Sequence, residues 1–459
     1  MQTIECATGE TTPLRHRRAV ALGMGALLLL ASSSPSRAQD ERFLVQNLEL
    51  VGHSDLNQRA PNASVWAHRT FAYVGTTGAR GATGVAACGG HGVTIVDLAD
   101  PTRPTVVGTL AERSGTSAED VQVLAADGPA FRGDLLATGL QPCSGSGVGG
   151  LSLWDVTSPR EPVELSFFDV GAGLSGVHEL TMFRREGRTI GLLAVPFSES
   201  MNGDALGDLR IVDLSDPRAP RQLAHWDAGV ALGLDARSGL GRDSRMYAHS
   251  VRASIDGKLA YVAYWDAGVI ILDISDLRNP RYLGRTTFGS DDEGNAHSAV
   301  TARGGRVLIQ ADEAVPLRAD GVADGALSTT GPSSQWGYLR FWDVTNPAMP
   351  IQVGTFATAR ARGSRAVGAD AGWYTVHQVA VLGDRLYASW YSDGVRVLDI
   401  SDPTRPRETG FFIPGIPAPG VEGAEREDRP FVWGIYARED LILASDHQSG
   451  LYVLRDLSR

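Results

Sequence analysis

The chain has 459 residues, of which 43% are hydrophobic and 21% charged, with 54 glycines, 23 prolines and three cysteines. This composition excludes disorder as the main state, and so few cysteines exclude a disulfide-dense mini-scaffold. The formal net charge of −11 argues against nucleic acid or an anionic membrane surface as the main partner. The length allows two or three ordinary domains, or one large domain built from repeats.

The first 38 residues have the pattern of a secretory signal peptide. Arg15, Arg17 and Arg18 precede an apolar run over residues 19–31, and Ser36-Arg37-Ala38 provides a small-x-Ala cleavage site. The apolar run is too short to cross a bilayer, and no later stretch is longer, so we expect no transmembrane segment. We therefore predict a secreted, periplasmic or cell-surface protein. The general and the twin-arginine export routes both remain open.

One twelve-residue pattern recurs along the rest of the chain. Its first half is apolar and β-branched enough for a strand buried on both faces, and its Asp/Asn-Pro step ends that strand. The aligned aspartates lie beside this turn, where we expect a structural role: Asp97, Asp155, Asp213, Asp273, Asp343 and Asp399. The copies are VTIVDLADPTRP from Val93, LSLWDVTSPREP from Leu151, LRIVDLSDPRAP from Leu209, VIILDISDLRNP from Val269, LRFWDVTNPAMP from Leu339, VRVLDISDPTRP from Val395 and the truncated LYVLRDLSR from Leu451.

Each full copy follows two further predicted strands and precedes a fourth. Residues 259–264 are an example of the strand before a copy, and residues 281–284 of the strand after one. Four antiparallel strands repeated seven times, without helical periodicity, predict an all-β, seven-bladed β-propeller as the single domain of residues 40–459. Residues 47–52 resemble a fourth strand, and we expect them to complete the last blade and close the ring.

The repeated strand, present here as TIVDL, RIVDL and IILDI, resembles that of the LVIVD-repeat family of secreted or surface propellers from bacteria and archaea. The resemblance covers residues 43–459 and implies the propeller fold. It implies little about function, because one propeller architecture serves many unrelated functions.

Four of the predicted first strands begin at a histidine. Because all first strands of a propeller start at the same end and line its centre, we expect these imidazoles to converge: His178, His249, His297 and His377. Further candidate ligand-binding side chains fall at the same end: Glu119, Asp120, Glu199, Asp266, Asp312, Asp393, Asp446 and His447, with the acid Glu313 beside Asp312. Neutral imidazoles with carboxylates to orient them are typical of a transition-metal site, the one cofactor that the sequence indicates. Alternatively, the histidines only hydrogen-bond neighbouring blades and the acids are ordinary turn residues.

Long insertions between second and third strands fall at this same end, at residues 75–92, 141–150, 199–207 and 313–337. Cys88 and Cys143 lie in the insertions of adjacent blades, where an oxidising compartment favours a disulfide; two unrelated free thiols are the alternative. We expect a monomeric binding or scaffold protein that presents this loop-rich face to a protein, glycan or small-molecule ligand. The alternatives are a metal-dependent enzyme, an oxidoreductase or a hydrolase, and a purely structural envelope component.

Overall fold

The computed structural model describes residues 43–80, 86–87, 90–143, 147–171, 175–198, 206–234, 246–289, 292, 294–314, 336–363, 372–415 and 429–458. The chain divides into two units, Met1–Asp40 and Glu41–Arg459, and every described residue belongs to the second. The predicted signal peptide lies outside the described residues. Within them, no helix is both long enough and apolar enough to cross a membrane.

The predicted all-β class and four-stranded antiparallel sheets are confirmed. Four sheets have four strands each, in the orders β13 (Leu180–Arg185), β14 (Arg188–Ala194), β15 (Leu209–Asp213), β16 (Arg221–Trp226); β17 (Ser250–Ala253), β18 (Leu259–Ala263), β19 (Val269–Asp273), β20 (Arg281–Arg285); β21 (Ala296–Ala302), β22 (Val307–Asp312), β23 (Leu339–Asp343), β24 (Ile351–Phe356); and β29 (Val432–Ala437), β30 (Ile442–Asp446), β31 (Gly450–Asp456), β2 (Leu48–Ser54).

The remaining strands extend the same pattern. A five-stranded sheet has the order β25 (Val379–Leu382), β26 (Arg385–Ser389), β27 (Val395–Asp399), β28 (Arg407–Pro414), β1 (Phe43–Gln46). An eight-stranded sheet consists of two groups of four strands that only the Thr76–Ala118 pairing joins: β3 (Asn62–His68), β4 (Phe71–Thr76), β7 (Val93–Asp97) and β8 (Thr105–Leu110), then β9 (Thr116–Asp127), β10 (Arg132–Pro142), β11 (Gly150–Asp155) and β12 (Val163–Asp169). β5 (Ala79–Arg80) pairs with β6 (Ala86–Ala87). The helices in the described residues are single turns: η1 (Leu56–Gln58), α2 (Ala228–Leu232) and η2 (Arg303–Gly305).

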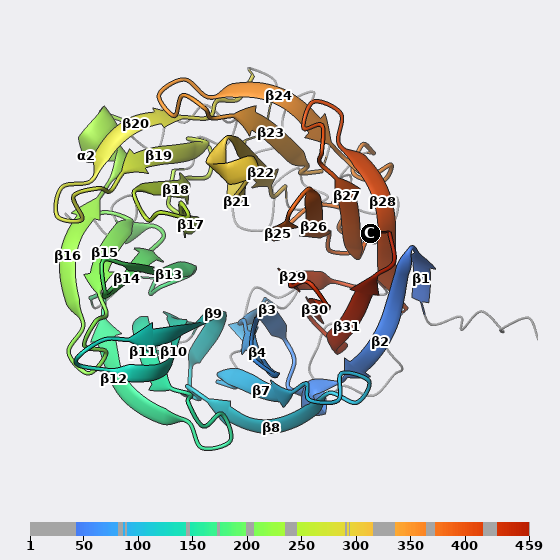
Figure 1. Cartoon of the computed structure of the whole chain (residues 1–459), viewed down its shortest axis with the longest axis horizontal. Helices are drawn as coiled ribbons and strands as arrows, with labels where there is room; N and C mark the ends of the chain where they lie inside the picture. The colour runs from blue at the N-terminus through green and yellow to red at the C-terminus, as the bar shows by residue number, and fades with distance from the viewer. Residues whose placement is uncertain are drawn as a thin grey trace, which may run out of the picture. The chain divides into compact units, whose positions relative to one another are not determined.

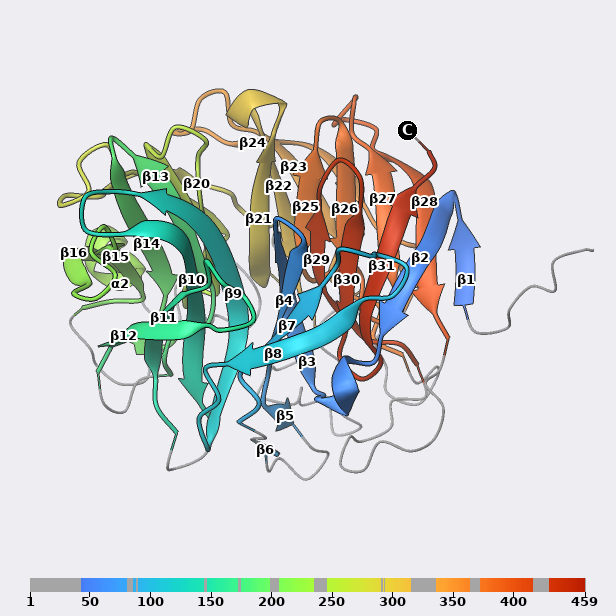
Figure 2. The same ribbon diagram turned by 60° about the horizontal axis from the view of Figure 1, so that its bottom comes forward.

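Within residues 43–458 these sheets follow one another around a common centre, which makes the fold propeller-like (Figure 1). The first strand of each group, from β3 and β9 to β29, lies nearest the centre, and the fourth strand lies farthest from it (Figure 1). Figure 2 shows the sheets from the side, with β25 to β28 side by side in one twisted layer. Residues at the start of any first strand therefore face the same central region.

The recurring pattern supplies the third strand of each group and the turn after it. Strand β15 is buried at all five positions, as expected for a strand covered on both faces. The aligned aspartates accept a hydrogen bond from the backbone N–H two residues further on, at 2.8–3.0 Å, and so stabilise the turn: Asp97, Asp155, Asp213, Asp273, Asp343 and Asp399. This geometry agrees with the structural role predicted for them.

Glycines in the fourth strands allow neighbouring groups to approach closely. A Cβ atom on Gly354 of β24 would lie 2.2 Å from the carbonyl oxygen of Pro403, in the turn after β27. Gly52 of β2 has the same relation to Pro101, in the turn after β7, again at 2.2 Å. Only a residue without a side chain fits at these two positions. Gly52 therefore packs as a fourth-strand glycine, although it lies near the start of the described chain.

Apolar side chains fill the spaces between neighbouring sheets and form the core. Ile211 of β15 and Val262 of β18, both fully buried, belong to one such cluster. Phe341 of β23 and Leu386 of β26 belong to another. This packing holds each first strand in place against its neighbours and so determines where the side chains at the centre lie.

Candidate functional site

Four histidines from four neighbouring sheets lie at the inner ends of the first strands: His178 before β13, His249 before β17, His297 in β21 and His377 before β25. The backbone N–H groups of His178, His249 and His377 occupy one repeated position in the ladder. Each donates to the carbonyl of the residue that ends the second strand of the same sheet. The recurring strand pattern therefore brings the imidazoles to one level, as the sequence predicted.

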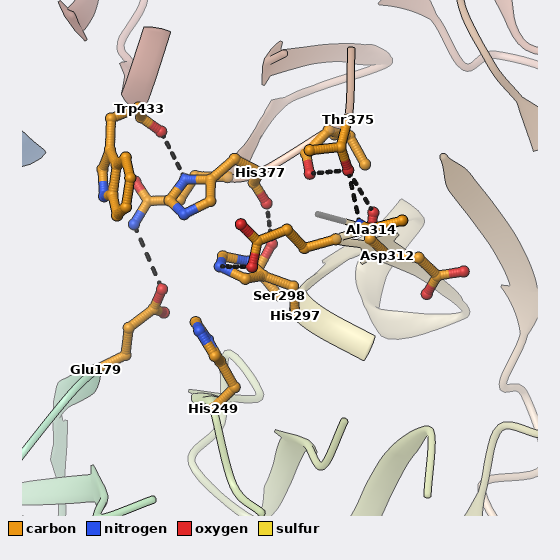
Figure 3. A network of polar contacts seen from close by, with 12 residues as sticks. Glu179, His249, His297, Ser298, Asp312, Ala314, Thr375, His377 and Trp433 are labelled. Atoms are coloured by element: carbon orange, nitrogen blue, oxygen red, sulfur yellow. Dashed lines mark hydrogen bonds and ion pairs between the residues drawn. The ribbon is translucent and has the colours of Figure 1, made fainter. Parts of the chain in front are cut away.

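The four rings touch in succession. The ring centroids of His178 and His249 are 4.2 Å apart, those of His249 and His297 3.9 Å, and those of His297 and His377 4.1 Å. Figure 3 shows the last three with Glu179 beside them. The four imidazoles thus form an arc, which we call the histidine arc.

Two members of the histidine arc have their outer nitrogen fixed by a partner. His377 donates from Nδ1 to the carbonyl of Trp433 at 2.7 Å, which places the lone pair on Nε2 (Figure 3). Nδ1 of His178 lies 2.8 Å from Oε1 of Gln141 and 3.3 Å from Oε2 of Glu119. A partner on one nitrogen that leaves the other free for an ion is the usual arrangement of metal-ligating histidines. His377 has this arrangement, whereas Nε2 of His178 is hydrogen-bonded to Nε2 of His249 at 2.9 Å.

The two central members of the arc lack such partners. His297 is fully buried, and neither of its ring nitrogens makes a hydrogen bond of normal geometry among the described residues, although the backbone of His377 lies near enough to act on its pKa. Nδ1 of His249 is buried and without a hydrogen-bond partner in the same part of the chain. An unsatisfied buried polar group costs about 1–3 kcal/mol, so such a group in a native structure calls for an explanation.

Two carboxylates complete the site. Glu179, His249 and His297 each offer a ligand atom, and these three atoms lie within 4.8 Å of one another. The same holds for His297, Glu313 and His377. In both carboxylates, Oε1 accepts a hydrogen bond from a neutral donor. The Gln378 amide donates to Glu179 at 3.4 Å, and the Tyr391 hydroxyl donates to Glu313 at 2.5 Å.

Burial and neighbouring charges divide the histidine arc into two electrostatic types. Burial and the adjacent histidines lower the pKa of His249 and of His297 well below the usual value, and burial lowers that of His377 to about 4. Burial also opposes the charge on His178, but the carboxylates of Glu119, Glu179 and Asp120 together outweigh it and raise the pKa of His178 to about 9. Three imidazoles are therefore neutral at pH 7, with lone pairs available for an ion.

Polar side chains surround the histidine arc, among them Glu179 and Gln378, which directly follow His178 and His377 in the chain. Burial raises the pKa of Glu179 to about 7, although the Arg252 guanidinium lies 3.4 Å from its Oε2. Gln378 donates to Glu179 and also to Oγ of Ser64, at 2.7 Å, and so connects the first strands of three sheets. Burial likewise raises the pKa of Asp120, whose Oδ2 accepts the N–H of Leu180 at 2.8 Å.

The acids predicted at the ends of second strands lie in turns and ion pairs. Asp266 accepts the N–H of Asn295 at 3.0 Å. Asp312 pairs with the buried Arg340 at 2.6 Å. Asp393 binds Thr358, Arg360 and Arg396, while Asp446 accepts N–H groups of Phe431, Gln448 and Ser449.

The other candidates divide between the centre and the surroundings. Glu119 and Asp120 lie beside the histidine arc, as described above. His447 is stacked on Trp433 with centroids 5.3 Å apart, and burial lowers its pKa to about 4. Glu199 lies outside the described residues, as does Cys88, so the predicted disulfide of Cys88 with Cys143 stays a prediction.

Sequence reasoning placed Glu313 among the acids at this end, beside Asp312, but missed Glu179, the other carboxylate that faces the histidine arc. Glu179 directly follows His178. The alignment of the first-strand histidines could have identified Glu179, because it occupies the position directly after His178. Gln378 occupies the equivalent position after His377, but the alignment does not show that the two side chains are in contact.

The comparisons with known proteins bear on the fold. The model of the LVIVD repeat matches residues 86–111, 247–287 and 375–412. The chain contains LVIVD repeats. Their presence at three places is consistent with a protein of the LVIVD-repeat family, and it confirms the resemblance predicted from the repeated strand. The second and third LVIVD matches include His249 and His377.

Comparisons with whole proteins add less. No curated protein matches this chain. Among solved structures, a crystal structure of the computationally designed Ika8 protein is similar, with a TM-score of 0.46 and 9% sequence identity. The match covers 89% of this chain and 99% of that chain.

Proposed function

We propose that this protein binds a divalent first-row transition-metal ion through the histidine arc. The observation that carries the proposal is His297: it is fully buried, it lies in both groups of candidate ligands, and neither ring nitrogen makes a hydrogen bond of normal geometry among the described residues. If the histidines served only to lock the sheets together, each ring would be expected to hydrogen-bond a neighbour. An ion supplies the partner that His297 lacks.

The spacing of the nitrogens fits such an ion. Zinc in proteins is mostly tetrahedral with imidazole nitrogens at about 2.0–2.1 Å, so the nitrogens that bind one ion lie about 3.3 Å apart. The 2.9 Å contact between Nε2 of His178 and Nε2 of His249 is a hydrogen bond, and His178 carries a raised pKa, so His178 is not counted among the ligands. The ligand atoms of each three-residue group lie within 4.8 Å of one another, so any pair farther apart than about 3.3 Å would move inward on binding.

Charge and donor type favour a transition-metal dication. The neutral imidazoles contribute no charge, whereas Glu179 and Glu313 can contribute two negative charges that balance a dication. Imidazole suits zinc, copper, iron and nickel, while calcium and magnesium prefer sites made of oxygen atoms. Such an ion would supply Lewis-acid or redox chemistry, and an oxidoreductase or hydrolase activity stays a prediction.

Metal analysis of the untagged full chain tests the proposal. The protein purified without chelator, or loaded with Zn²⁺ and desalted, should hold about one ion per chain. His297→Ala and His377→Ala should lose it. His53→Ala should keep it, because His53 lies exposed on β2, away from the arc. A chain that binds no metal, or a His297→Ala variant that binds as well as the unmodified chain, would contradict the proposal.

We also propose that the propeller has seven blades and that β2 closes it. Support comes from the antiparallel pairing of β2 with β31, which joins the start of the described chain to its last repeat. Contact of β29 with β3, from opposite ends of the chain, and the packing of Gly52 point the same way. A variant without β2 would expose the edge of β31 and should unfold at a lower denaturant concentration.

Export and a ligand-binding face complete the proposal. The basic, apolar and small-residue order of residues 1–38 supports export. The insertions that support a binding face lie largely outside the described residues, so protein, glycan and small-molecule ligands remain alternatives. N-terminal sequencing of the protein from the periplasm or medium should begin at Gln39, and an uncleaved cytoplasmic chain would contradict export.

A further inference from the structure

Tyr391, in the turn between β26 and β27, holds one of the two carboxylates of the histidine arc. The Tyr391 side chain is fully buried, and its hydroxyl donates to Oε1 of Glu313 at 2.5 Å. The other carboxylate oxygen, Oε2, lies 3.7 Å from Nε2 of His297. The hydroxyl therefore binds the oxygen that does not face the histidine.

The backbone and the neighbouring rings keep Tyr391 in this position. Its φ of 31° lies in the left-handed region that bulky residues rarely adopt. Its carbonyl accepts the N–H of Val432 in an isolated bridge to the next sheet, and its ring stacks on Phe431 with centroids 4.0 Å apart. Such conformations persist where the surroundings over-determine them, and they concentrate at functional sites.

The turn between β18 and β19, in the sheet before β21, has the same backbone arrangement. Trp265, between β18 and β19, also has a left-handed φ, of 47°, and bridges to Ala296 beside His297. Its ring stacks on His249 with centroids 5.4 Å apart. Trp265 has no hydroxyl, so the shared backbone places an aromatic ring beside the arc, whereas the bond to a carboxylate is specific to Tyr391.

We propose that Tyr391 is a positioning residue of the metal site: by holding Oε1 of Glu313, it keeps Oε2 directed at the ion bound by His297 and His377. This inference rests on the proposed metal-binding function. If Tyr391 only packs against its neighbours, its hydroxyl has no influence on metal affinity. If it acts through Glu313, its hydroxyl matters only while the carboxylate is present.

A double-mutant cycle on the full chain separates these cases. Co²⁺ is the probe, and its dissociation constant is measured by competition with a chelator and its absorption spectrum recorded. Tyr391→Phe keeps the ring and removes the hydroxyl, and it should weaken binding about 10-fold to 100-fold, the usual effect of losing a partner of a metal ligand. Glu313→Gln should weaken binding as well, and adding Tyr391→Phe to it should change the affinity no further.

Tyr264→Phe is the matched control. Tyr264 is also a buried tyrosine bonded to a carboxylate, Oδ2 of Asp227 at 3.2 Å, but it lies outside the histidine arc. Its variant should bind Co²⁺ as the unmodified chain does, with an unchanged spectrum. Unfolding of all variants in chelator shows whether a loss of affinity reflects a loss of folded protein.

The outcomes are distinct for the two proposals. Unchanged Co²⁺ affinity in Tyr391→Phe, with weakened binding in Glu313→Gln, overturns the positioning role and leaves the metal site standing. Equal losses in the presence and absence of the Glu313 carboxylate overturn it too. An unmodified chain that binds neither Co²⁺ nor Zn²⁺ overturns the proposed function and the positioning role with it.

Discussion

Replacing Asp312 by alanine should destabilise the fold without removing the metal ion. The Asp312 carboxylate and the Arg340 guanidinium are 2.6 Å apart, and their side chains are only 4% and 5% exposed. Truncating one partner of such a pair leaves an uncompensated buried charge, which typically costs about 3–5 kcal/mol. Arg340 keeps Asp292 and Gln352, each at 3.2 Å, so we expect the lower end of that range, about 3 kcal/mol.

Denaturant unfolding of the metal-free variant, with chelator present, measures this loss as a lower midpoint at an unchanged slope. Replacing both partners together, as Asp312→Leu with Arg340→Met, should cost much less, because no unpaired charge remains. The Zn²⁺ content of Asp312→Ala should equal that of the unmodified chain. A cost below about 1 kcal/mol, which is the range of an exposed pair, would refute the reasoning. A loss of the metal ion would show that Asp312 belongs to the site after all.

Three further outcomes follow from the structure. Gly52→Ala places a Cβ atom 2.2 Å from a backbone oxygen and should lower the free energy of unfolding by about 1–3 kcal/mol. Gly108→Ala, whose Cβ atom would have its nearest contact at 3.9 Å, should lower it little, and equal losses in the two variants would contradict the close approach. The hydrogen bonds from Ser401 and the charge of Arg407 lower the pKa of Asp399 to about 2 from 3.8, so its stabilising contribution is present above pH 3.8 and is lost as the pH falls through 2. Between pH 3.8 and pH 2 the free energy of unfolding of Asp399→Asn should therefore fall less than that of the unmodified chain. Identical acid unfolding curves for the two proteins would contradict this expectation. Zn²⁺ at 100 times its dissociation constant should stabilise the unmodified chain by about 2.7 kcal/mol and leave His297→Ala unchanged, as thermal unfolding with and without chelator would show.

Much of the fold could be predicted from the sequence because each copy of the repeat has the same pattern of apolar strand residues and turn residues. The apolar half of the LVIVD strand and the aspartate after it predict a buried strand and a turn, and both are present in β15 and β27. The same alignment predicts that His249 and His377 occupy equivalent positions. Their convergence is a consequence of that equivalence and needs no knowledge of long-range contacts.

The carboxylates of the site could not be selected in the same way. Asp312 and Glu313 are adjacent acids at the end of β22, and only the three-dimensional partners distinguish them. Arg340, 28 residues further on, binds the first, while Tyr391, 78 residues further on, binds the second. Such partners come from other strands and sheets, and no local pattern in the sequence identifies them.

The central claim is that the histidine arc holds a metal ion, and crystallography at the absorption edge of zinc tests it most directly. For crystals of the untagged chain loaded with Zn²⁺, the account predicts one strong anomalous peak about 2.0–2.2 Å from ring nitrogens of His249, His297 and His377. No such peak, with His297 instead hydrogen-bonded to a protein group or an ordered water, would contradict it.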